Sequence, residues 1–182
     1  MGWFSRTDKG AGDAGGSGDE GGRRADGAGV AEGDDGPEYD PSVPMRPRVR
    51  PVGDAEVARV TAGLAELDAL GVDVDDLASL GAGFDAAMGE WTATPERRRA
   101  DEDARREPWV IGLGEHLVRH TDLEWSLVHD AFGTDLAVAG GEDDFVVVPA
   151  NLVGARWMGG QQGWVPGVLA HLVRVREGRW ER

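Results

Sequence analysis

The stretch PWVIGLGEHLVRH, residues 108–120, has the apolar spacing of a helix that packs into a core. At about 100° per residue, its small and apolar side chains fall on one arc of roughly 160°, made by Val110, Ile111, Leu113, Gly114, Leu117 and Val118. Trp109, His116 and His120 lie together on one flank of this arc, within about 40° of one another. The sequence therefore predicts a core helix with two histidines at its border.

These two histidines allow two interpretations. His116 and His120 stand at i and i+4 and could chelate a metal ion, but a site needs a third ligand, and spacing does not single out one of His129, Asp130 or Asp122. A border position explains both rings without a metal, because imidazole packs its ring and keeps a nitrogen in water. We therefore predict no metal and no cofactor. A small-ligand or metal-binding sensor or enzyme that uses both histidines remains the alternative.

After this helix the apolar spacing changes from helical to alternating. Trp125 and Leu127 lie on one face of a first predicted strand, and Leu136 and Val138 on one face of a second. A third strand, residues 145–148, is apolar on both faces, so we expect it to be the central or best-covered strand. The connections are short and rich in glycine and aspartate, which predicts a three-stranded antiparallel meander.

Helices are predicted on both sides of this meander. Two amphipathic helices precede it, one from an N-cap at Asp54 and one from about Asp75. The charged run 96–107 indicates a solvated helix that ends before a new start at residue 108. A short helix capped by Asn151 and a last helix from about Trp164 follow the strands. The predicted fold class is α+β, with N-terminal helices, the meander, and C-terminal helices packed on the sheet.

The chain divides into three segments by composition. Residues 1–45 carry ten acids and four bases, a net charge of −6, and are mostly Gly, Ala, Asp and Glu, which predicts a disordered acidic tail. Residues 46–53 are rich in Arg and Pro and are predicted to be an extended linker, or else a segment that lies against the acidic domain. Residues 54–182 are predicted to form a single domain.

Charge and composition argue against several classes of partner. The net charge of −15 disfavours binding to nucleic acid and to anionic lipid. No apolar run approaches the roughly 20 residues of a membrane-spanning helix. The chain has no cysteine, which is typical of a reducing compartment, so we expect a cytoplasmic protein with no nucleic-acid and no membrane partner.

A recognition surface is predicted near the ends of the strands. Six residues there could contact a ligand or partner: Trp125, Asp130, Thr134, Asp135, Arg156 and Trp157. The alternative is structural, since aspartates cap turns and an arginine can pair with one of them as a buttress. No nucleophile elbow of the G-x-S-x-G type is present, so no catalytic residue is assigned.

A series of short motifs runs through this region of the chain. They are I-G-L-G-E-H-L at 111–117, E-W at 124–125, D-A-F-G-T-D-L-A at 130–137, and V-P-A-N-L-V at 148–153 followed by Arg156 and Trp157. In this order they resemble a bacterial family of a domain of unknown function, over roughly residues 85–172. The resemblance implies a compact α+β unit in which Trp125, Asp130, Gly133 and Arg156 are characteristic, and it supplies no catalytic residues.

The function that these observations favour is a non-enzymatic protein-interaction or regulatory module, for example an adaptor or immunity-like protein with an unidentified protein partner. The acidic tail would then serve as a flexible tether. A structural acidic protein in which the tail does the work is a further alternative. The sequence leaves the oligomeric state open.

Overall fold

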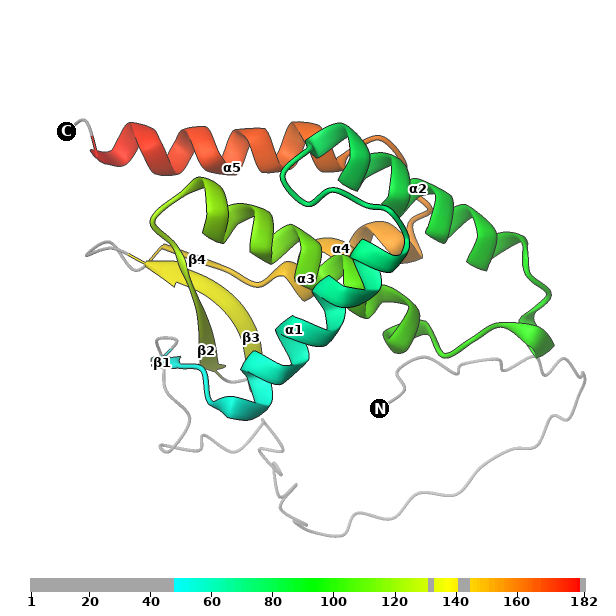
Figure 1. The fold of residues 1–182 in the computed structure, drawn as a ribbon, viewed down its shortest axis with the longest axis horizontal. Coiled ribbons are helices and arrows are strands. Elements are labelled where there is room, and N and C mark those ends of the chain that lie inside the picture. The colour runs from blue at the N-terminus through cyan, green and yellow to red at the C-terminus, as the bar shows by residue number, and fades with distance from the viewer. Residues whose placement is uncertain (1–47, 131–132, 141–144, 181–182) are drawn as a thin grey trace, which may run out of the picture. The chain divides into compact units, whose positions relative to one another are not determined.

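The computed structural model describes residues 48–130, 133–140 and 145–180. Its elements, in chain order, are β1 (Arg48–Pro51), α1 (Asp54–Ala69), α2 (Leu77–Ala93), a short 3-10 helix η1 (Glu96–Arg98), α3 (Glu102–His120), β2 (Glu124–Asp130), β3 (Gly133–Gly140), β4 (Phe145–Val147), α4 (Pro149–Met158) and α5 (Val165–Trp180) (Figure 1). The predicted α+β class is confirmed. The predicted acidic tail lies outside the described residues.

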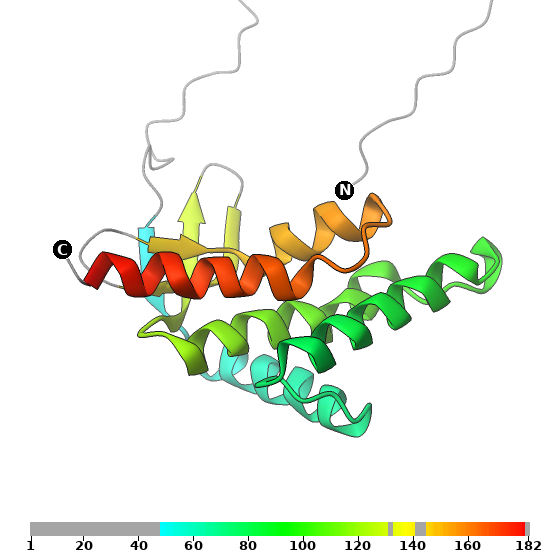
Figure 2. The same cartoon turned by 90° about the horizontal axis from the view of Figure 1, so that it is seen from above.

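Helix α3 is the element on which the others assemble. It packs against α1, α2, α4 and α5, and against β2 and β3 of the sheet. It lies between α1 and α5 in both views (Figures 1 and 2). Trp109, Ile111, Leu113 and Leu117 are all at least 98% buried, which confirms the core helix predicted from the apolar arc. Within the described ranges, no helix is long and apolar enough to cross a membrane.

Residues 102–107 of the charged run form the first part of α3 and not a separate helix, while residues 96–98 of the run form η1. Asp101 caps α3 by accepting a hydrogen bond from the backbone N–H of Ala104 at 2.9 Å. Pro108 lies inside the helix, so the predicted new start at this residue is wrong. Thr94, which precedes this run, is the C-cap of α2. An internal proline costs about 3 kcal/mol, and we attribute its tolerance here to the burial of the side chains that follow it.

The sheet has four strands, not the predicted three. All neighbours are antiparallel, in the order β1-β2-β3-β4. The additional strand is β1, which pairs with β2 from Arg48 opposite His129 to Pro51 opposite Ser126. It comes from the segment predicted as a linker. Alternating arginine, valine and proline carry no strand signal, and only pairing with β2 makes this segment a strand.

The interior strands of the sheet are β2 and β3, and residues 145–148 do not supply one. Strand β4 is at the edge, and its Phe145 and Val146 are only half-buried. In β3, four successive residues are buried: Leu136, Ala137, Val138 and Ala139. The prediction relied on the continuous apolar run at residues 145–148. It missed the greater burial of β3, because two of the buried residues there are alanines, which add little to the hydrophobicity of the sequence.

One face of the sheet packs on α3 through a tryptophan. Trp125 of β2 lies opposite Val138 of β3, which is fully buried in the main core. The indole of Trp125 lies so close to Gly114 of α3 that a Cβ atom there would be 2.1 Å from its Cη2 atom. The absence of a side chain at Gly114 thus permits the contact between helix and sheet.

The C-terminal helices close the other side of α3. Helix α4 begins at Pro149 directly after β4, with Val148 as its N-cap, so Asn151 is not the cap that was predicted. Helix α5 begins at Val165, one residue after the predicted start, and packs on α2 and α3. Aromatic rings from α2, α3, α4 and the segment before α5 meet in this region, each edge-on to or tilted against a neighbour: Phe84, Trp91, Trp109, Trp157 and Trp164.

Candidate functional site

His116 is buried in the core and fixed to the segment between α1 and α2. Its side chain is 3% exposed, and its Nδ1 lies 2.8 Å from the carbonyl oxygen of Val74. Because a carbonyl only accepts, we assign the proton to Nδ1, which leaves a lone pair on Nε2. Burial lowers the pKa of His116, so the ring is neutral near pH 7. The predicted border position is therefore wrong for this residue.

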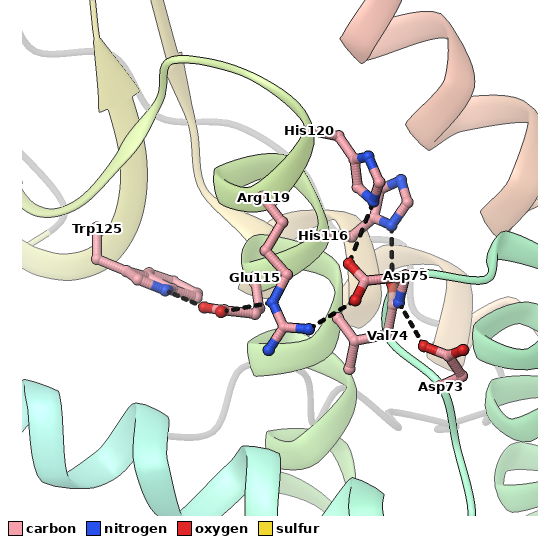
Figure 3. A network of polar contacts seen from close by, with 8 residues as sticks. All are labelled: Asp73, Val74, Asp75, Glu115, His116, Arg119, His120 and Trp125. Atoms are coloured by element: carbon pink, nitrogen blue, oxygen red, sulfur yellow. Dashed lines mark hydrogen bonds and ion pairs between the residues drawn. The ribbon is translucent and has the colours of Figure 1, made fainter.

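His120 does lie at the border. Its ring stacks on that of His116 at a centroid distance of 4.2 Å, and its Nε2 is 3.3 Å from Oδ1 of Asp75. The second carboxylate oxygen of Asp75 accepts a hydrogen bond from Arg119 at 2.8 Å (Figure 3). Desolvation alone would raise the pKa of Asp75, but the hydrogen bond and charge of Arg119 outweigh it and lower that pKa.

The same arginine joins this cluster to the sheet. Arg119 Nε donates to one oxygen of Glu115 at 2.9 Å, and the indole N–H of Trp125 donates to the other at 2.9 Å (Figure 3). A polar chain therefore runs from the loop before α2, along α3, to β2. The i, i+4 spacing of Glu115 and Arg119 on a helix predicts their pairing, but no sequence signal predicts the contacts with Asp75 and Trp125.

A surface cavity of about 480 Å³ opens beside the two histidines. Its lining comes from the start of α2, the end of α3 and one side of α5: Asp75, Asp76, Leu77, His116, His120, Ala170, Val173, Arg174 and Glu177. The apolar wall is Leu77, Ala170 and Val173, and the remaining residues are charged or can form hydrogen bonds. The cavity therefore combines an apolar surface with hydrogen-bonding groups, as binding sites for polar ligands commonly do.

The metal-binding interpretation of His116 and His120 finds no third ligand in the described part of the chain. No group of three or more His, Asp or Glu side chains there could hold a metal ion. Of the three candidate ligands, Asp122 binds Arg176 through two hydrogen bonds of 2.6 Å, and His129 contacts the Thr134 hydroxyl at 2.9 Å. Each of the two stacked histidines also contacts an oxygen acceptor through one of its ring nitrogens.

The six predicted recognition residues do not form one surface. Trp125 and Asp130 are five positions apart on β2, so their side chains project from opposite faces of the sheet, about 17 Å apart along the strand. In β3, Thr134 and the exposed Asp135 alternate in the same way. Thr134 shares a face with His129, its partner across the strands, while Asp135 lies opposite Val128.

The other two predicted residues belong to the aromatic region of the core. Trp157 is 3% exposed and packs against Phe84 and Trp91, so it is not a surface contact residue. Arg156 donates to the carbonyl of Leu152 and lies 4.4 Å above the Trp164 ring. It forms no ion pair with any described residue, so the contacts do not include the predicted buttress with an aspartate. The i, i+4 spacing of Val153 and Trp157 is the signal that would have placed Trp157 inside.

A family model covers much of this architecture. Residues 92–167 match the model of a domain of unknown function, DUF3806. This match confirms the resemblance to such a family and extends from the end of α2 to the start of α5. No curated protein and no solved structure matches the chain.

The DUF3806 region supplies only part of the cavity. His116 and His120 lie within it, together with Glu115, Arg119 and Trp125 of the polar network. Asp75 and Asp76 precede the region, and Ala170, Val173, Arg174 and Glu177 follow it. The cavity is thus formed where the DUF3806 region meets the segments on either side of it.

Proposed function

We propose that this domain is a non-enzymatic interaction or regulatory module, and that a polar group of its ligand or partner enters the cavity beside His116 and His120. One observation carries the proposal. His116 is neutral, its Nδ1 is bonded to Val74, and its Nε2 has no hydrogen-bond partner among the described residues although the ring lines the cavity. A neutral imidazole nitrogen of this kind accepts a hydrogen bond.

The remaining groups support a ligand that donates hydrogen bonds. Glu177 and Asp76 add carboxylate oxygens to the lining, against the single guanidinium of Arg174. The carboxylate of Asp75 is already engaged by Arg119 and His120, so it fixes the position of His120. An amine or guanidine on a short aliphatic chain matches both these acceptors and the apolar wall of Leu77, Ala170 and Val173.

The predicted bacterial and cytoplasmic setting is part of this proposal. The absence of cysteine from the sequence supports the cytoplasmic part, and the resemblance to a bacterial family of a domain of unknown function supports the bacterial part. An unidentified protein partner could place an arginine or lysine side chain against the hydrogen-bond acceptors of the cavity. A small basic metabolite could bind there in the same way.

NMR titration tests the proposal directly. The full chain is titrated with the capped amino acids N-acetyl-arginine amide, N-acetyl-lysine amide and N-acetyl-glutamate amide, while the ring signals of His116 and His120 are followed. We expect saturable shifts with the basic probes and none with the acidic probe. The variant His116→Phe keeps an aromatic ring but removes both ring nitrogens, including Nε2, so the His120 signal should lose its response to the basic probes.

The matched control is His171→Phe, which changes an exposed histidine of α5 that does not line the cavity. Its response should equal that of the unmodified chain. Equal binding of the basic probes to His116→Phe would refute the proposed site.

A second candidate function rests on the contact between His120 and Asp75. A histidine held by a carboxylate can act as a general base, which is the enzyme alternative. Conversion of a bound capped amino acid to a product would favour this enzyme function, if the same spectra detect the product and His120→Phe abolishes it.

A further inference from the structure

A second polar cavity lies at the opposite end of β2 from Trp125, and the proposed function does not use it. Its volume is about 650 Å³, and its described lining is Arg48, Val49, Arg50, His129 and Thr134. None of these residues lines the cavity beside His116. The described lining contains two guanidinium groups, one imidazole and one hydroxyl, and no carboxylate.

The strand register explains how these groups come together. Arg48 lies directly opposite His129, and His129 directly opposite Thr134, so a row of three side chains crosses β1, β2 and β3 on one face. Arg50 is two positions along β1 and therefore projects from the same face. The acidic neighbours Asp130 and Asp135 project from the opposite face by the same alternation.

These arginines differ from most arginines of the helices. Arg59, Arg105, Arg106, Arg119 and Arg176 each form a salt bridge with a described carboxylate. Arg48 and Arg50 form no salt bridge with any residue in the described ranges. Two cations on the same face of β1, with no salt bridge to a described residue, create a local site for an anion on this acidic protein.

The backbone adds a second recognition element. Strand β1 is the first in the sheet order, so one of its edges is unpaired within the described sheet, and all four of its residues are exposed. Val49, between the two arginines, is 43% exposed. An exposed edge of this kind can pair with an extended segment of another chain, which then places alternate side chains on each face.

We propose that β1 binds an acidic, extended peptide segment of a partner protein, which pairs with the edge of β1 that has no neighbour in the described sheet. Acidic residues at alternate positions of that segment face Arg48, Arg50 and His129. The residues between them are small or apolar and lie on the side of Val49. The alternation follows from the strand geometry. The acidic character follows from the two guanidinium groups, which have no carboxylate partner among the described residues.

Fluorescence anisotropy with the full chain tests this inference. The probe is an end-blocked, labelled eight-residue peptide that alternates glutamate and valine. A second peptide has the same composition, with its glutamates in one block. We expect the alternating peptide to bind at least fivefold more tightly than the block peptide. Because ion pairs contribute, its affinity should fall when salt rises from 50 to 500 mM.

Two variants with the same change in charge separate this site from general electrostatics. Arg48→Glu/Arg50→Glu should weaken binding of the alternating peptide at least tenfold. Arg97→Glu/Arg98→Glu changes two exposed arginines of η1 that also lack a salt bridge in the described chain, and binding should stay within twofold. Arg48→Gln/Arg50→Gln, which adds no negative charge, should give an intermediate loss. Circular dichroism of each variant verifies the fold.

Several results would overturn the inference. They are an equal loss in both double-glutamate variants, equal affinity for the alternating and block peptides, and the absence of saturable binding at 1 mM protein. Tighter binding of a single-stranded oligonucleotide of equal charge would indicate a nucleic-acid site instead. The capped amino acids that probe the cavity beside His116 do not report on this strand, so the two proposals can fail separately.

Discussion

The Nδ1–H of His116 donates a 2.8 Å hydrogen bond to the carbonyl oxygen of Val74, and this bond joins the end of α3 to the segment between α1 and α2. Val74 is itself 7% exposed, so the bond is shielded from water. It satisfies a buried backbone acceptor and fixes the orientation of the ring that lines the cavity.

The pH dependence of stability should report on this histidine. Burial lowers the pKa of His116 below its ordinary value of 6.5, so the unfolded chain binds a proton more readily than the folded one. The stabilisation is complete above pH 6.5 and is lost as the pH falls through the folded-state pKa. Urea unfolding between pH 7.5 and pH 5 should show this loss.

The variant His116→Phe should flatten this pH dependence. It also removes the donor to Val74, which should lower the unfolding free energy at pH 7.5 by about 1–3 kcal/mol. His171→Phe, at an exposed position, should retain the original slope. A slope unchanged in His116→Phe would assign the pH effect to other groups.

Replacement of Glu115 tests the polar link between α3 and the sheet. The Glu115 side chain is 14% exposed and accepts hydrogen bonds from Arg119 and Trp125. We expect Glu115→Ala to lower the unfolding free energy by about 1–2 kcal/mol, because the indole N–H loses its acceptor. Glu66→Ala, on the exposed side of α1, should change it by less than about 0.5 kcal/mol. Chemical denaturation at neutral pH measures both.

The space around two helical glycines, one in α3 against β2 and one in α5, predicts opposite effects when each is replaced by alanine. Gly114→Ala would place a Cβ atom 2.1 Å from the Trp125 ring and should destabilise the domain by about 1–3 kcal/mol. Gly167→Ala meets no atom within 4 Å on the exposed side of α5, so the gain in helix propensity should stabilise by up to about 1 kcal/mol. Thermal denaturation that shifts both variants in the same direction would contradict this interpretation.

The pair formed by Arg176 and Asp122 should matter more than surface ion pairs. Arg176 is 3% exposed and donates two hydrogen bonds of 2.6 Å to Asp122. Asp122→Ala leaves a buried guanidinium without this partner and should cost about 3 kcal/mol. Asp103→Ala removes an exposed i, i+3 partner of Arg106 and should cost under about 1 kcal/mol. Similar losses in the two variants, measured by urea unfolding, would show that burial does not distinguish these pairs.

The sequence by itself determined the α+β class, the core face of α3, and the positions of most helices and strands. These features depend on the local period of apolar residues, and burial follows that period where one face of an element is covered. The extent of α3 was not predicted, because Pro108 is a local signal for a helix start and tertiary packing overrides it.

Tertiary structure alone decided the fourth strand and both candidate sites. Strand β1 forms only because β2 is available to pair with it. The row of Arg48, His129 and Thr134 arises from the register of β1, β2 and β3. Asp75 meets His120 from another segment, and α5 supplies the rest of that cavity. Such contacts join segments that are far apart in the chain, so no local period of apolar residues predicts them. They form only when the elements pack together.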